Sequence, residues 1–154
     1  MVAAGDKVKA TDITSITPTA ADWTPTITNL TKGSGSSEEW WYSQTGDWVD
    51  AQGTIVLGTS PSFAGSLTWS LPVAAYSGAS TNDQSIGDWV YRDGSSGWYA
   101  GTVETYDSSG TDGRCAGSWS GSAPSEFVGQ GGSSPVSPAS GDKISLSLRY
   151  RAAT

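Results

Sequence analysis

The segment Lys143–Arg151, KISLSLRYR, decides the fold class, because apolar and polar residues alternate along its whole length. An apolar side chain at every second position is the pattern of a β-strand that buries one face and leaves the other in water. Gly141 and Asp142 stand directly before this segment, and both residue types tolerate the positive φ of tight turns. We therefore expect the chain to turn at these two residues and to enter an amphipathic strand.

The same alternation recurs through the chain. It is clear at Leu67, Trp69 and Leu71, after which Pro72 is expected to end the strand. Segments rich in glycine, serine and aspartate separate the alternating runs, as is typical of hairpin turns. Weaker alternation covers residues 24–30, 39–45, 48–57, 86–93, 98–106 and 114–119. About eight strands at this spacing predict an all-β fold, namely an antiparallel β-sandwich of jelly-roll type.

The 154 residues suit a single domain preceded by an arm. Residues 1–22 mix charged with β-branched residues and contain a proline, so we expect an extended arm there and the sandwich over residues 23–154. The apolar members of the arm are its expected attachment residues: Val8, Ile13 and Ile16. Residues 75–84 and 121–140 are expected to form long surface loops, where binding residues often lie.

Charge and composition disfavour several kinds of partner. The formal charge of −7 and the pI of about 4.2 repel phosphate backbones, so nucleic acid is not an expected partner. No apolar run approaches the roughly 18 residues that span a membrane, and the N-terminus lacks the basic and apolar parts of a signal peptide. We therefore expect synthesis in the cytoplasm and no membrane insertion.

The sequence also predicts that the protein is not an enzyme. Histidine is absent, which removes the usual general base and the commonest metal ligand. Residues 107–113 lack the ligand order of a calcium loop and are expected to form a hairpin, and Cys115, the single cysteine, is expected to be buried. The carboxylates that could form a glycosidase pair are expected to be solvated: Glu38, Glu39, Glu104, Glu126, Asp47, Asp50, Asp88 and Asp93. No catalytic, metal or cofactor site is therefore predicted.

Aromatic residues are the most informative side chains, with eight tryptophans and six tyrosines. Three tryptophans within alternating runs are expected in the core: Trp48, Trp69 and Trp89. Trp40 and Trp41 are adjacent, so in a strand they point to opposite faces and only one can enter a single core. Trp98 and Tyr99 pose the same problem. We expect the outward member of each pair at a subunit interface or in second-layer packing, with a sugar-stacking platform as the alternative.

Several motifs occur in a definite order: AGD at residues 4–6, GDWV at 46–49, GTIVLG at 53–58, LTWSLPVAA at 67–75 and SGDKI at 140–144. In this order they resemble a domain found at the C-terminal ends of phage tail fibres and in small virion proteins of phages that infect actinobacteria. The resemblance spans nearly the whole chain, and its motifs are turns and strand ends. It implies an antiparallel sandwich, usually assembled as a trimer, with no cofactor and no catalytic residue.

We therefore expect a non-enzymatic structural protein on the surface of a bacteriophage virion, serving assembly or stabilisation and contact with the host surface. A capsid decoration protein bound to the major capsid lattice is one alternative, favoured because the chain has no long shaft segment. A free carbohydrate-binding module is the other. The expected partners are copies of the same chain in a trimer, other virion proteins of the tail or capsid, and a glycan of the host cell surface.

Overall fold

The computed structural model describes residues 20–76, 84–94, 97–106, 109–117, 125–126 and 137–153. Within these ranges the chain forms strands and no helix, so the all-β prediction is confirmed. Each alternating segment of the sequence overlaps one observed strand. The strands are β1 (Ala21–Asp22), β2 (Ile27–Thr31), β3 (Ser37–Thr45), β4 (Trp48–Val56), β5 (Ser62–Ser70), β6 (Ser85–Asp93), β7 (Gly97–Thr105), β8 (Asp112–Gly117), β9 (Ser125–Glu126) and β10 (Lys143–Arg151).

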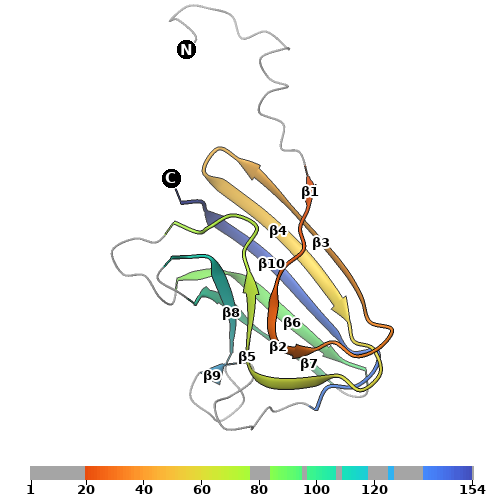
Figure 1. The fold of residues 1–154 in the computed structure, drawn as a ribbon. Coiled ribbons are helices and arrows are strands. Elements are labelled where there is room, and N and C mark those ends of the chain that lie inside the picture. Colours follow the sequence, from red (N-terminus) through yellow and green to blue (C-terminus); the bar gives the residue numbers. More distant parts are fainter. Residues whose placement is uncertain are drawn as a thin grey trace, which may run out of the picture.

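The strands form one antiparallel sheet in the order β1-β3-β4-β10-β6-β7-β8-β5-β2, and β9 pairs with β8. This sheet curls into a half-barrel, with β2 and β5 lying in front of β4, β10 and β6 in Figure 1. Two contacts join the facing parts. The ring centroids of Phe63 on β5 and Tyr91 on β6 are 6.2 Å apart, and the Tyr150 hydroxyl donates to the Val73 carbonyl at 2.8 Å. The predicted antiparallel class is confirmed, whereas this strand order does not confirm a jelly roll of two sheets.

Strand β10 lies between β4 and β6 and carries the alternation that the sequence predicts. Its apolar side chains are all buried: Ile144, Leu146, Leu148 and Tyr150. The register places them beside the inward residues of both neighbouring strands, so one core runs across the inner face of the sheet. Trp69 and Trp89 are buried in this core, as predicted.

Trp48 was predicted to lie in the core, and that prediction is wrong. Its side chain is 50% exposed, whereas Val49, Ala51 and Ile55 are completely buried. Because successive residues of a strand face opposite ways, the inward Val49 turns Trp48 to the outer face. There the guanidinium of Arg149 lies 5.8 Å from the Trp48 ring centroid. In the sequence, either Trp48 or Val49 could be the inward residue of this strand. The prediction chose Trp48 because it is the larger of the two.

Several predicted segments fall outside the described residues. Residues 1–19 are among them, with the expected attachment residues Val8, Ile13 and Ile16, so the extended arm stays a prediction. The same holds for residues 77–83 and for most of the predicted loop at 121–140. The described chain enters the sheet at β1, whose two residues pair with Trp41 and Tyr42 of β3.

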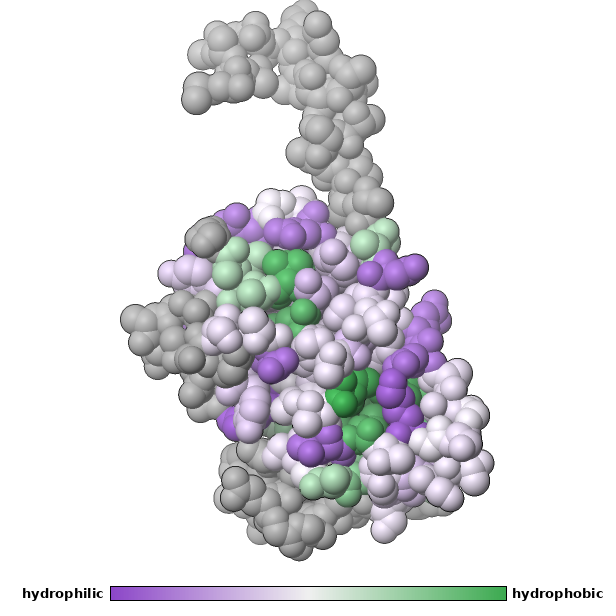
Figure 2. Space-filling view, in the orientation of Figure 1, coloured by the Kyte–Doolittle hydropathy of each residue, from purple (hydrophilic) through white to green (hydrophobic). Residues whose placement is uncertain are grey.

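The outer side of the folded-over part is mainly polar. Figure 2 shows this face, on which apolar colour is confined to small patches framed by polar side chains. The partly buried apolar residues of β2, β5 and the segment after β5 pack against the core: Ile27, Leu30, Phe63, Leu71 and Val73. The apolar side chains of β2, β5 and the segment after β5 therefore pack mainly against the core.

The buried carboxylate of Asp142 links the turn before β10 to β6 and to the residue after β6. Asp142 is 1% exposed and follows Gly141, whose φ of 92° makes the predicted turn into β10. The Asp142 carboxylate accepts hydrogen bonds from the Tyr91 hydroxyl, from the Gly94 amide at 2.9 Å and from the Ala139 amide at 2.7 Å. Burial, followed by the hydrogen bond to Asp142, raises the pKa of Tyr91 far above its ordinary value, so this hydroxyl stays a donor.

Replacing Asp142 by alanine is expected to destabilise the fold by about 3 kcal/mol, because the buried Tyr91 hydroxyl and two backbone amides in partly buried hydrogen bonds lose their acceptor at once. Chemical unfolding followed by tryptophan fluorescence measures the change. Asp50→Ala is the matched control, since Asp50 is exposed and its carboxylate lies 3.7 Å from Arg149 in a surface ion pair. That variant should lose less than about 0.5 kcal/mol. Equal effects of the two substitutions would refute the structural role of Asp142.

Candidate functional site

The outer face of β3, β4, β10 and β6 carries two parallel rows of side chains. Antiparallel pairing places Trp41 beside Gln52, Gln52 beside Ser147, and Ser147 beside Asp88. The second row, two residues further along each strand, contains Glu39, Thr54, Ser145 and Val90. Each row crosses four strands, so residues far apart in sequence share one surface.

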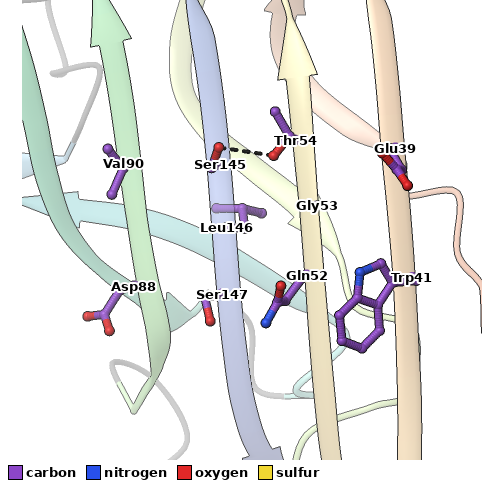
Figure 3. A pocket seen from close by; sticks show the side chains of 10 residues that line it. All are labelled: Glu39, Trp41, Gln52, Gly53, Thr54, Asp88, Val90, Ser145, Leu146 and Ser147. Carbon is purple, nitrogen blue, oxygen red and sulfur yellow. Dashed lines mark hydrogen bonds between the residues drawn. The ribbon is translucent and has the colours of Figure 1, made fainter. Parts of the chain in front are cut away.

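These two rows surround an open hollow with a volume of about 370 Å³. Figure 3 shows the lining residues on these four strands, with Trp41 at one side and Asp88 and Val90 at the other. The lining residues are Glu39, Trp41, Gln52, Gly53, Thr54, Asp88, Val90, Ser145, Leu146 and Ser147. A hollow of this size lies at the lower end of the range found for small-molecule sites.

The polar groups of the hollow are mostly neutral. The hydroxyls of Thr54 and Ser145 lie 3.0 Å apart in a hydrogen bond. Within the described part of the chain, the side chains of Gln52 and Ser147 make no hydrogen bond and face solvent with their donors and acceptors available. The lining contains no lysine or arginine, and its only ionisable groups are Glu39 and Asp88.

Glu39 and Asp88 do not form a glycosidase pair. They lie on β3 and β6, which are separated by β4 and β10 in the sheet. Three inter-strand spacings amount to roughly 14 Å, whereas the two carboxyls of glycoside hydrolases are at most about 9.5 Å apart. These two groups are therefore too far apart for the acid–base work of a glycoside hydrolase pair.

Trp40 and Trp41 point to opposite faces, as their adjacency predicts. Trp40 is 6% exposed, and its ring centroid lies 5.3 Å from that of Trp23 in an edge-to-face contact. It also covers Gly53, where a β-carbon would lie 1.7 Å from the indole. Trp41 is partly exposed and lines the hollow instead. Of this pair, Trp41 is the member that lines the hollow on the outer face.

The second adjacent pair is divided in the same way. Trp98 is 70% exposed, with the Arg92 guanidinium 5.3 Å from its ring centroid. Tyr99 is partly buried against the core, with its ring centroid 6.2 Å from that of Tyr91. Trp98 is therefore the outward member, and it does not line the hollow.

Most other acidic candidates take part in surface ion pairs. Lys32 binds the Glu38 carboxylate at 2.7 Å, and this contact is the main cause of the lowered pKa of Glu38. The remaining described pairs are Glu104 with Arg114 at 3.5 Å, Asp47 with Arg151 at 3.2 Å and Asp50 with Arg149 at 3.7 Å. The side chain of Glu126 lies outside the described part. These carboxylates neutralise neighbouring cations on the surface.

In the described ranges, no group of three acidic, cysteine or histidine side chains could hold a metal ion, and no helix is long and apolar enough to cross a membrane. Cys115 is buried, as predicted, and burial raises the pKa of its thiol. β7 and β8 pair antiparallel on either side of the predicted 107–113 turn, so the expected hairpin is confirmed.

Sequence reasoning identified Trp41 as half of an ambiguous pair but missed its polar neighbours. Gln52, Ser145 and Ser147 occupy the polar positions of alternating strands, which any solvated face would also show. Only the register of β3, β4 and β10 brings them beside one indole. A search for amide and hydroxyl residues on the wet face of strands flanking Trp41 would have found them.

Comparison of this chain with protein-family models, with curated proteins and with solved structures finds no match.

Replacing Trp40 and Trp41 one at a time should change the free energy of unfolding by different amounts. Trp40→Ala is expected to lower the free energy of unfolding by about 3–5 kcal/mol, because it empties a core site above Gly53. Trp41→Ala should lower it by about 1 kcal/mol or less, because its ring already meets solvent. Thermal and chemical unfolding of both variants checks the ranking, and a reversed order would contradict the assignment of the two faces.

Proposed function

We propose that the protein is a non-enzymatic structural and binding module displayed on the surface of a bacteriophage virion, where it serves assembly or stabilisation and contacts the host surface. The observation that carries the binding role is the outer face of β3, β4, β10 and β6, with Trp41 beside neutral polar side chains. The separation of Glu39 and Asp88 supports a role without catalysis.

The virion assignment rests on the ordered motifs of the sequence. Two of them form tight turns, since Gly46 has a φ of 58° and Gly141 a φ of 92°. The curled sheet, with β5 facing β6 across one core, is compatible with the sandwich that the resemblance implies. In this proposal residues 1–20, which precede β1, form the attachment arm. Binding to the major capsid lattice as a decoration protein is the alternative to a place on the tail.

A trimer is the proposed working unit. Exposed aromatic side chains on the outer face provide apolar area for contact between copies: Trp48 is 50% exposed and Trp98 is 70% exposed. Burial of aromatic rings is favourable in protein interfaces, where tryptophan, tyrosine and arginine are enriched. Trp48 and Trp98 each lie beside an arginine, so both groups are available on the same surface.

Intact particles provide the direct test of location. A labelled antibody against the protein is expected to decorate phage particles in electron microscopy, on the tail or across the capsid. A variant lacking residues 1–20 should unfold cooperatively like the full chain, because the described sheet starts at Ala21, yet it should be missing from the particles. Absence of the full-length protein from purified particles would reject the virion assignment, and loss of cooperative unfolding in the variant would reject a separable arm.

The trimer is tested by light scattering of the purified full chain at micromolar concentration. The expected mass is three times the 15.9 kDa of one chain. Replacing Trp48 and Trp98 together by serine should shift the mass toward that of a monomer, because the replacement removes apolar area from the proposed contact. A mass near 15.9 kDa that does not change on concentration would refute self-assembly.

A further inference from the structure

We infer that the hollow on the outer face binds a neutral or amino sugar, with Trp41 as the stacking platform and Gln52 and Ser147 as hydrogen-bonding partners. This inference rests on the proposed contact with the host surface and names the chemistry of that contact. It depends on three features of the hollow, namely its aromatic wall, its free neutral polar groups and its charge.

Trp41 supplies the aromatic wall. A pyranose ring has an apolar face of C–H groups and a rim of hydroxyls, so it needs a flat apolar surface beside polar groups. Trp41 is partly exposed on the outer face, and its row places the Gln52 amide and the Ser147 hydroxyl on the two adjacent strands. An indole beside polar groups is a common arrangement where one side of a ligand is apolar and the other is hydrated.

The polar groups have the donor and acceptor capacity that sugar hydroxyls require. A primary amide presents two N–H donors and a carbonyl acceptor, and each hydroxyl can donate and accept. The side chains of Gln52 and Ser147 make no hydrogen bond within the described ranges, whereas Thr54 and Ser145 bond to each other. A sugar bound against Trp41 would therefore find open partners without breaking an existing interaction between side chains.

The charge of the hollow selects among sugars. Glu39 and Asp88 lie at its two sides, and no lysine or arginine lines it. Carboxylates accept hydrogen bonds from hydroxyls and attract ammonium groups, but they repel phosphate and carboxylate. The net charge of −7 acts in the same direction at longer range. Neutral hexoses, N-acetylated sugars and free amino sugars fit this field, whereas teichoic acids and uronic acids do not.

A second protein chain is a poorer occupant of the hollow. The strongly exposed aromatic residues that suit a protein contact, Trp48 and Trp98, do not line it. Its rows contain mainly hydroxyl, amide and carboxylate groups, which are depleted or neutral in the centres of protein interfaces. The hollow and the aromatic contact surface are therefore two regions of one outer face.

Binding is tested on the full chain by titration calorimetry with tetrasaccharides of glucose, mannose, galactose, N-acetylglucosamine and glucosamine, with tetragalacturonate as the acidic probe. At least one neutral or amino sugar should bind, and tetragalacturonate should bind at least tenfold more weakly. Trp41→Ala should weaken binding at least tenfold. Tyr106→Ala is the control, since it removes a 46% exposed aromatic side chain outside both the hollow and the proposed contact between copies, and it should leave affinity within twofold. Gln52→Ala, at an exposed position, tests the same hollow if Trp41→Ala fails to fold.

Attachment of the labelled protein to host cells separates the two proposals. If the protein binds cells but no neutral or amino sugar, or if Tyr106→Ala and Trp41→Ala weaken sugar binding equally, the sugar site is wrong and the contact function stands. Preference for tetragalacturonate would also overturn the inference. If sugars bind in the hollow while cells and particles do not bind the protein, the sugar site stands and the virion function is wrong.

Discussion

The fold depends on one buried carboxylate that has three hydrogen-bond donors around it. Asp142 ties the turn before β10 to the end of β6 and to the Gly94 amide, and its own carbonyl accepts the Leu57 amide at 2.8 Å. Through the Tyr91 hydroxyl it also orients a ring that contacts Phe63 and Tyr99. Because Phe63 belongs to the folded-over β5, the same carboxylate supports the curl of the sheet. A buried acceptor without these donors would be strongly unfavourable, so the turn and the curl stabilise each other.

The packing of the inner face fixes the backbone that carries the residues of the hollow on the outer face. Trp40 lies across Gly53, which has no side chain to obstruct it, so one indole covers parts of two strands. The outward neighbours of these residues, Trp41, Gln52 and Thr54, then form a surface whose backbone is fixed from beneath. The geometry of the hollow is thus set by packing on the opposite side of the sheet.

Much of this could be predicted from sequence, since period-two alternation depends only on which residues meet water. Strand existence, the turn at Gly141 and the burial of Trp69 and Trp89 all follow from local pattern. The predicted burial of Trp48 is wrong because Trp48 and Val49 are both apolar and adjacent, so either could face the core. Which of the two faces inward depends on the neighbouring strands. The hollow could not be predicted for a similar reason. Strand β10 lies between β4 and β6 although it is about 50 residues away from β6 in sequence. No local sequence pattern shows that β10 and β6 are neighbours. Sequence supplied candidate residues, and long-range pairing supplied their arrangement.

The two edge strands of the open sheet affect whether copies of this chain can pair edge to edge at high concentration. At one edge β1 pairs with Trp41 and Tyr42 of β3, and β3 also carries Glu38 and Glu39. At the other edge β2 is interrupted by Asn29, whose φ of 64° coincides with a shift in register against β5. Negative charge and a bulge both oppose the addition of a further strand. Polymerisation through backbone hydrogen bonds is thereby discouraged at each end, which leaves side-chain faces as the means by which neighbouring molecules meet at high local concentration.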